Sequence, residues 1–278
     1  MTLLALTGIL AAGALVAGFL GSLTGLGGGV VIIPLLTLAL GVDIRYAIGA
    51  SLVSVIATSS GAAAAYVREG FTNMRIGMFL EIATTLGAVG GAFLALVVPS
   101  SAIAIIFGLM LLYSAYTTIR ARHSDGVAVA PDPLATRLKM NGSYPTPEGV
   151  KEYNVRGVPG GFGLMALAGV LSGLLGIGSG ALKVIAMDRV MKLPFKVSTT
   201  TSNFMIGVTA AASAGVYLSR GYIDPAIALP VMLGVLAGSL TGARLLTKTR
   251  TQVLRVVFAL VIVFLGFEMI YKGVSGRL

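Results

Sequence analysis

Glycine concentrates in two short stretches of a chain that is otherwise strongly apolar. The first stretch is GSLTGLGGG at Gly21–Gly29, and the second is SGLLGIGSG at Ser172–Gly180. Glycine costs roughly 1 kcal/mol relative to alanine inside a helix, so each stretch predicts a break in helical structure. A helix that begins after such a break presents free backbone N–H groups and the positive end of its dipole. The two breaks are therefore candidates for binding an anion.

Polar side chains that could contact an anion lie beside both breaks. Lys183 follows the second break, and an ionisable residue at membrane depth is a functional candidate by default. Each kind of side chain also has an alternative role that stays open. Lys183 would instead extend to the cytoplasmic surface, and the serine and threonine hydroxyls would instead bond to their own helices. The predicted substrate-binding residues are Thr24, Gly25, Gly27, Gly28, Gly29, Ser51, Gly176, Gly178, Ser179, Gly180, Lys183, Ser202 and Asn203.

Glu81 lies inside another apolar segment. It is the candidate residue for carrying a coupled proton, and the coupling ion of the transporter would be H⁺ or Na⁺. The alternative is an interfacial residue close to Arg75. Other glycines, among them Gly18, Gly87, Gly91 and Gly238, are expected to serve close helix packing.

The composition argues against most other chemistries. The chain has no cysteine and one histidine, His123, in a polar segment, so we expect no metal site, no cofactor and no catalytic residue. The net charge is +10, but no basic face with interleaved aromatic residues indicates nucleic-acid binding. The glycine spacings differ from those of nucleotide-binding loops. An enzyme is therefore not expected.

The elements that must position these residues are membrane helices. Hydrophobic residues make up 56% of the chain and charged residues 11%, whereas soluble domains carry about 25% charged residues. Apolar runs of about 20 residues recur, which is the length that spans a bilayer as a helix. The predicted segments are 3–23, 30–40, 46–67, 76–98, 101–119, 158–175, 181–191, 197–218, 225–246 and 252–271.

The chain contains an internal duplication. A shift of 151 residues places Gly25 on Gly176 and Ser51 on Ser202, without a gap. We predict a first transmembrane repeat over 1–120, a polar linker over 121–157 and a second transmembrane repeat over 158–278. Each repeat would hold one glycine-broken re-entrant hairpin and three transmembrane helices.

Basic residues predict how the repeats are oriented. The linker is rich in Lys and Arg, so the positive-inside rule places it in the cytoplasm. The uncharged turn VPSS of the first repeat corresponds to the basic turn LTKTRTQ of the second, which favours opposite orientations. The predicted fold class is thus an all-α polytopic membrane protein with two inverted repeats and both termini outside. The first segment, 3–23, is also long enough to span alone.

Two motifs resemble a known family. GxLTGxGGGxxxxPxL at Gly21–Leu36 and GLLGIGSGALKV at Gly173–Val184 are similar to the TauE/SafE sulfite exporters of bacterial and archaeal membranes. The resemblance covers nearly the whole chain. It implies transport of sulfite, sulfoacetate and related organosulfonates across the cytoplasmic membrane, usually as export coupled to an ion gradient.

We therefore predict a secondary transporter for a small anion, with alternating access around a midplane site between the two breaks. A passive channel for a small anion or neutral solute is the alternative, and a membrane-embedded enzyme is a more distant one. The expected partners are the anion, the lipid bilayer and a coupling ion, with no nucleic acid. A homodimer is one option for the oligomeric state, which the sequence leaves open.

Overall fold

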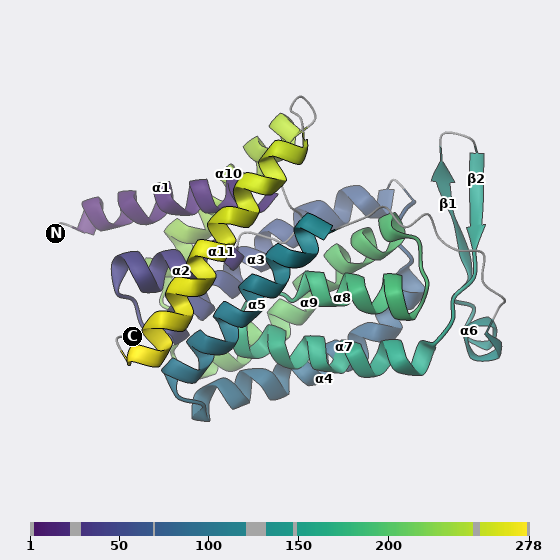
Figure 1. Cartoon of the computed structure of the whole chain (residues 1–278), viewed down its shortest axis with the longest axis horizontal. Helices are drawn as coiled ribbons and strands as arrows, with labels where there is room; N and C mark the ends of the chain where they lie inside the picture. The colour runs from purple at the N-terminus through teal and green to yellow at the C-terminus, as the bar shows by residue number, and fades with distance from the viewer. Residues whose placement is uncertain are drawn as a thin grey trace.

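The computed structural model describes residues 3–22, 29–68, 70–120, 132–146, 149–246 and 251–276. Long helices pack side by side, and a small β-hairpin projects at one end (Figure 1). The helices of the first half are α1 (Leu3–Ser22), α2 (Gly29–Pro34), the π-helical turn η1 (Leu35–Ala39), α3 (Ile44–Arg68), α4 (Met74–Val97) and α5 (Ser100–Arg120). Those of the second half are α7 (Val158–Leu175), α8 (Gly180–Ile185), the π-helical turn η2 (Ala186–Val190), α9 (Phe195–Ser219), α10 (Pro225–Leu246) and α11 (Thr251–Ser275).

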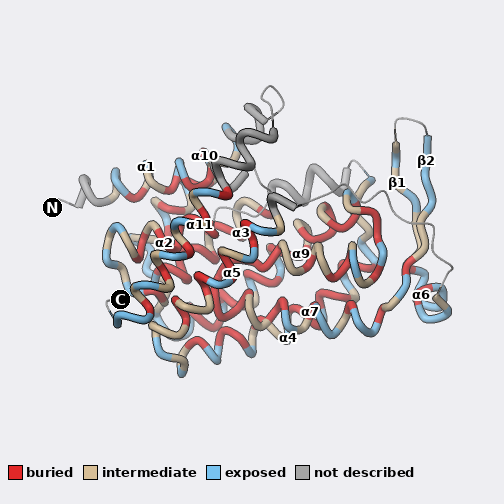
Figure 2. The backbone as a smooth tube through the Cα atoms, in the orientation of Figure 1, coloured by how far each residue is buried: buried red, intermediate tan, exposed pale blue. Residues whose placement is uncertain are grey.

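The helices suit a bilayer in length and composition. Within the described residues, Met74–Val97, Ser100–Thr117 and Val158–Leu175 are each long and apolar enough to cross a membrane. Shorter apolar stretches lie within α1, α2 with η1, α3 and α10. Large apolar side chains such as Leu86 and Phe264 are exposed on the outer surface. Figure 2 shows the buried residues along the middle of the bundle. The prediction of an all-α membrane protein is confirmed at this level.

Glycines allow two helix pairs to approach closely, and the two pairs correspond. In the α4–α7 pair, a Cβ at Gly87 would overlap the carbonyl oxygen of Ala166. In the α1–α10 pair, a Cβ at Gly238 would overlap the carbonyl oxygen of Leu15. The shift of 151 residues converts one contact into the other. The same close approach occurs at Gly18 and Gly91, so the packing role predicted for these glycines is confirmed.

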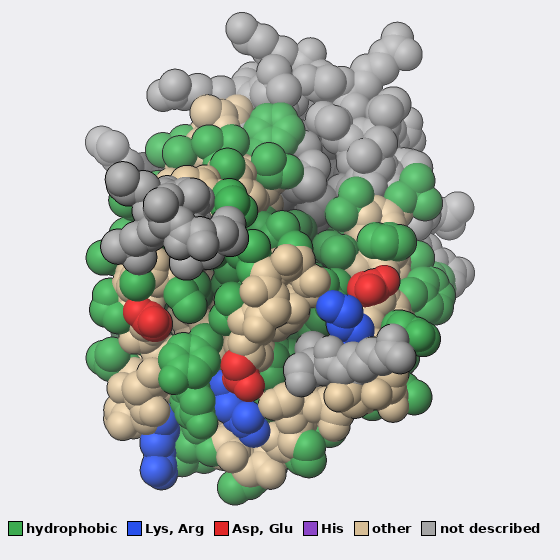
Figure 3. All heavy atoms as spheres, turned by 90° about the vertical axis from the view of Figure 1, so that its left-hand side faces the viewer, with side chains coloured by type: hydrophobic (Ala, Val, Ile, Leu, Met, Phe, Trp, Pro, Cys, Tyr) green, Lys and Arg blue, Asp and Glu red, His purple; other side chains and the backbone are tan. Residues whose placement is uncertain are grey.

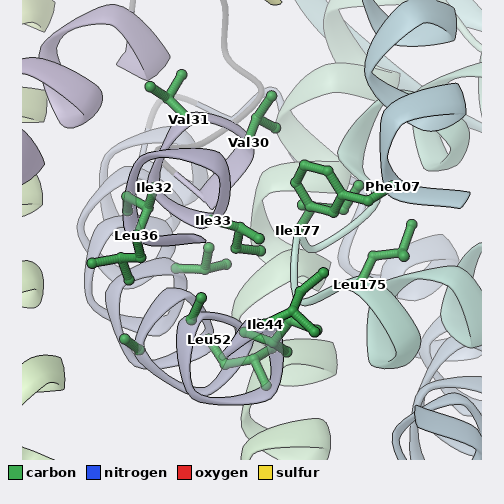
Figure 4. Packing of buried hydrophobic residues seen from close by; sticks show 14 of the residues in the cluster. Val30, Val31, Ile32, Ile33, Leu36, Ile44, Leu52, Phe107, Leu175 and Ile177 are labelled. Atoms are coloured by element: carbon green, nitrogen blue, oxygen red, sulfur yellow. The ribbon is translucent and has the colours of Figure 1, made fainter. Parts of the chain in front are cut away.

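Helices α3 and α9 pack against each other between these pairs. Around them a large apolar cluster joins residues of α2, α3 and α5 with the second glycine break (Figure 4). It includes Ile32 and Ile33 of α2, Phe107 of α5 and Ile177 of the break, all buried. The core of the protein therefore surrounds the segment in which the sequence predicted the site.

The linker carries a folded element that the sequence analysis did not predict. After α6 (Pro133–Arg137), strands β1 (Gly142–Thr146) and β2 (Gly149–Tyr153) pair antiparallel. Asn73 joins this hairpin to the helices: its Nδ2 donates to the Met140 carbonyl at 3.0 Å and to the Tyr153 hydroxyl at 2.8 Å. Its backbone N–H donates to Thr201 Oγ1 of α9 at 3.1 Å.

The two ends of the molecule differ. The β-hairpin and α6 lie at one end of the long axis, and both chain termini lie at the opposite end (Figure 1). On the face toward the termini, hydrophobic side chains outnumber charged ones, and acidic and basic side chains adjoin one another at two places (Figure 3).

Candidate functional site

The second glycine break is a tight backbone turn that needs glycine. Gly176 ends α7 and Gly178 follows in the turn, each with φ at +67°, in the left-handed region that favours glycine. Ser179, with φ at +43°, shares this region, and α8 begins at Gly180. All four residues are buried. The predicted break is therefore present, and it lies in the interior of the protein.

Only the end of the first break falls within the described residues. Thr24, Gly25, Gly27 and Gly28 lie outside them. Gly29 is described, is buried and begins α2. The predicted helix start at the end of the first break is therefore seen directly.

Residues from the two halves meet beside Gly176. Ser51 of α3 donates a hydrogen bond from its Oγ to the Gly176 carbonyl at 2.9 Å. Gly29 lies against both groups, because a Cβ there would stand 2.5 Å from Ser51 Oγ and 3.3 Å from the Gly176 oxygen. Three residues predicted for the site, from α2, α3 and the second break, are thus brought together.

The hydroxyl groups predicted for the site donate to backbone carbonyls of α7, of α8 and of the glycine break between them. Besides Ser51, Ser202 of α9 donates to the Gly180 carbonyl at 3.3 Å, and Ser179 donates to the Ala168 carbonyl of α7 at 2.6 Å. These bonds hold the turn in place from both α3 and α9. An anion bound at the turn would then meet backbone N–H groups, with the hydroxyls as supports. Asn203 is half-buried at the next position of α9.

Lys183 is fully buried and does not reach the surface, so the alternative of a surface-reaching lysine is wrong. Its Nζ donates to Thr209 Oγ1 of α9 at 2.6 Å. On the other side of that hydroxyl lies Glu81 of α4, whose Oε1 is 2.6 Å from Thr209 Oγ1. The two charges are therefore linked through one threonine.

Glu81 is 8% exposed, and its carboxylate has unequal surroundings. Its Oε1 also accepts a hydrogen bond from Thr85 Oγ1 at 3.1 Å, whereas its buried Oε2 has no hydrogen-bond partner. Arg75, the neighbour considered from the sequence, instead donates to the Lys139 carbonyl at 3.3 Å.

Sequence reasoning missed the link between Lys183 and Glu81, and it missed Thr85 and Thr209. The duplication held a signal for the link. The shift of 151 residues places Lys183 on Ile32 and Glu81 on Met232, so both charged residues replace apolar residues of the other half. Two unmatched charges of opposite sign, one in each half, favour a pair.

An open pocket of about 620 Å³ borders Glu81 between α4 and α9. Its lining is apolar except for Glu81 and Thr85, and it includes Met78, Ile82 and Phe204. Among the described residues, no group of three or more His, Cys, Asp or Glu side chains could hold a metal ion.

Comparisons with known proteins cover nearly the full chain. The family model for the sulfite exporter TauE/SafE matches residues 10–269. The probable membrane transporter protein YunE of Bacillus subtilis is 27% identical over 267 residues, 94% of this chain and 96% of the relative. The probable membrane transporter proteins YdhB of Bacillus subtilis and MJ0441 of Methanocaldococcus jannaschii are 27% and 24% identical, over 83% and 92% of this chain and 84% and 92% of the relatives. No solved structure matches the chain.

Proposed function

The chain belongs to the TauE/SafE sulfite exporter family of membrane transporters, and from that premise we propose that it is a secondary transporter for a small anion. The substrate class is sulfite, sulfoacetate or a related organosulfonate, and the direction is export across the cytoplasmic membrane. The observation that carries the proposal is the meeting of Gly29, Ser51 and Gly176 inside the protein.

The substrate would lie between the two glycine breaks. The N–H groups of Gly27–Gly29 and Gly178–Gly180 would hold its oxygens at the positive ends of the two short helical segments. Lys183 would supply a full positive charge one helical turn beyond Gly180. The positive φ of Gly176 and Gly178 supports this proposal, because non-helical backbone inside a bilayer is tolerated where it lines a cavity or is buried in protein.

Alternating access would come from movement of one half against the other. The corresponding contacts of α4 with α7 and of α10 with α1 support a two-fold relation between the halves. With α6 and the β1–β2 hairpin of the linker at one end and both termini at the other, we propose that the linker is cytoplasmic and that the termini are outside. The repeats would then be inverted, each with a re-entrant hairpin, as in many secondary transporters.

A passive channel for a small anion or neutral solute is the second candidate. The close glycine-mediated contacts favour a transporter, because two packed arrangements of rigid helix pairs can alternate. Reconstituted vesicles separate the two candidates. A secondary transporter accumulates labelled anion above its equilibrium level when a second gradient drives it, whereas a channel only equilibrates the anion.

A thermal-stabilisation screen tests the substrate class. We would measure the unfolding temperature of the purified protein with sulfite, sulfoacetate, isethionate, acetate and chloride. A ligand at a hundredfold excess over its Kd stabilises the folded state by about 2.7 kcal/mol, which raises Tm by roughly 5 °C for a chain of this size. Stabilisation by the sulfur oxyanions but not by acetate or chloride supports the proposal, and no stabilisation by any of them contradicts it.

A further inference from the structure

Lys183, Thr209 and Glu81 form a continuous hydrogen-bonded chain across three helices. Lys183 Nζ, Thr209 Oγ1 and Glu81 Oε1 are joined by two contacts of 2.6 Å each. Lys183 is fully buried and Glu81 nearly so. An unpaired charge inside a membrane is expensive, so each of these residues depends on the other for compensation.

The other half of the duplication shows that the fold does not require these charges. The corresponding residues are Ile32, Thr58 and Met232. Ile32 is fully buried in the apolar core, and Thr58 donates to its own helix at Ser54. The same helix arrangement is therefore stable with apolar residues in both charged positions, so the charged chain serves a purpose other than packing.

Thr209 can serve two protonation states of Glu81 without moving. Its Oγ1 accepts from Lys183 and lies 2.6 Å from Glu81 Oε1 and 2.9 Å from the Met205 carbonyl. When Glu81 is ionised, the Thr209 hydroxyl donates to it. When Glu81 is protonated, the carboxylic acid can donate to Thr209 Oγ1, and the hydroxyl proton turns to the Met205 carbonyl.

Lys183 is the charged group that faces Glu81 from the helices packed around it. Helix α7, which packs on α4, has no ionisable side chain. On α9, Lys196 lies over the Phe71 ring at 3.6 Å, and the Tyr217 hydroxyl donates to the Gly173 carbonyl. On α4 itself, Arg75 is engaged with the linker. The charge state of Glu81 therefore depends mainly on whether Lys183 is paired with it or with another anion.

We propose that Glu81 binds one proton for each substrate anion that binds, with Lys183 exchanging the Glu81 carboxylate for the anion as its counter-ion. This inference rests on the proposed transport of an anion at the adjacent glycine breaks. In the empty site, Lys183 and ionised Glu81 sum to zero charge. With a monovalent anion bound, the proton taken from water forms the O–H of Glu81, and the sum is again zero.

Neutrality in both states has a mechanistic consequence. The protein can then reorient with or without cargo and without carrying net charge through the bilayer core, which would be costly. Proton and anion would cross together. Export would proceed when the internal concentration of the anion exceeds the external one by more than the opposing pH gradient, about tenfold for each pH unit.

Titration calorimetry of the full-length protein with isethionate tests the proposal. Isethionate is an organosulfonate that carries one negative charge throughout the neutral pH range. Repeating the titration in buffers of different ionisation enthalpy gives the number of protons taken up on binding. We expect about one proton for the wild type and none for Glu81→Gln, which retains hydrogen-bonding atoms toward Thr85 and Thr209. Glu268→Gln, on α11, is the matched control and should behave as the wild type.

The pH dependence of isethionate affinity should reflect the number of protons taken up on binding. Wild-type affinity for isethionate should rise about tenfold per unit decrease in pH while the empty site holds an ionised Glu81, and that of Glu81→Gln should stay constant. Binding by the wild type without proton uptake overturns the inference while leaving anion binding intact. Equal proton uptake by wild type and Glu81→Gln overturns the assignment to Glu81. If no anion of the thermal screen binds the wild type, the proposed function fails and this inference fails with it.

Discussion

Replacing Lys183 by isoleucine should destabilise the protein far more than replacing both Lys183 and Glu81. The duplication supplies the replacements, because Ile32 and Met232 occupy the corresponding positions of the other half. Lys183→Ile alone leaves a buried carboxylate with Thr85 and Thr209 as its hydrogen-bond partners. Lys183→Ile combined with Glu81→Met removes both charges together.

The burial of the pair fixes the size of the effect. Lys183 is 0% exposed and Glu81 8% exposed, and removing one partner of such a buried pair costs about 3–5 kcal/mol. Replacing both partners by apolar residues is often neutral or stabilising. At roughly 2–4 °C of Tm per kcal/mol, the single variant should unfold on the order of 10 °C below the wild type, and the double variant close to it.

Thermal unfolding in detergent measures both variants together with Glu81→Met alone, which completes a double-mutant cycle. Lowering the pH should reduce the defect of Lys183→Ile, because a protonated carboxyl carries no buried charge. If the double variant loses as much stability as the two single variants added together, Lys183 and Glu81 do not interact, and the reasoning about the pair is refuted.

Three further substitutions test other parts of the structure. Gly173→Ala should lower the free energy of unfolding by about 1–3 kcal/mol, because a Cβ there overlaps a carbonyl of α4. Gly90→Ala, which has open space around it, is the control and should be neutral or slightly stabilising. Equal effects of the two substitutions would contradict the packing argument. Ser51→Ala should lower the free energy of unfolding by about 1–3 kcal/mol and weaken anion binding, because it leaves a carbonyl of the second break unpaired. Ser54→Ala is the control, because the Ser54 hydroxyl bonds to its own helix. The site model fails if both substitutions weaken anion binding equally. Asn73→Ala should lose about 1 kcal/mol and speed hydrogen exchange in the β1–β2 hairpin, and unchanged exchange would show that this anchor is unimportant.

Much of the helical framework could be predicted from hydrophobic runs and from the duplication. The predicted segment 76–98 corresponds to α4 (Met74–Val97), and 197–218 corresponds to α9 (Phe195–Ser219). Both glycine-rich stretches were predicted as breaks, and the second is one. These features depend on local composition, which a sequence displays directly.

Other features depend on contacts that local composition does not display. The strands β1 and β2 are short and polar, and β1 contains Pro145, so hydrophobic alternation did not mark them. The π-helical turns η1 and η2 follow the short helices α2 and α8 without a distinctive residue pattern. The link of Lys183 to Glu81 runs through Thr209, and only the mismatch with Ile32 and Met232 pointed to it.

Transport into reconstituted vesicles tests the central claim most directly. Purified protein would be inserted into liposomes, and uptake of labelled sulfite and isethionate would be followed with the acidic side outside, for the wild type and for Lys183→Met. The wild type is expected to accumulate the anions above equilibrium, and Lys183→Met to do so far more slowly. Uptake that only equilibrates, or accumulation by Lys183→Met at the wild-type rate, would contradict an anion transporter with Lys183 at its site.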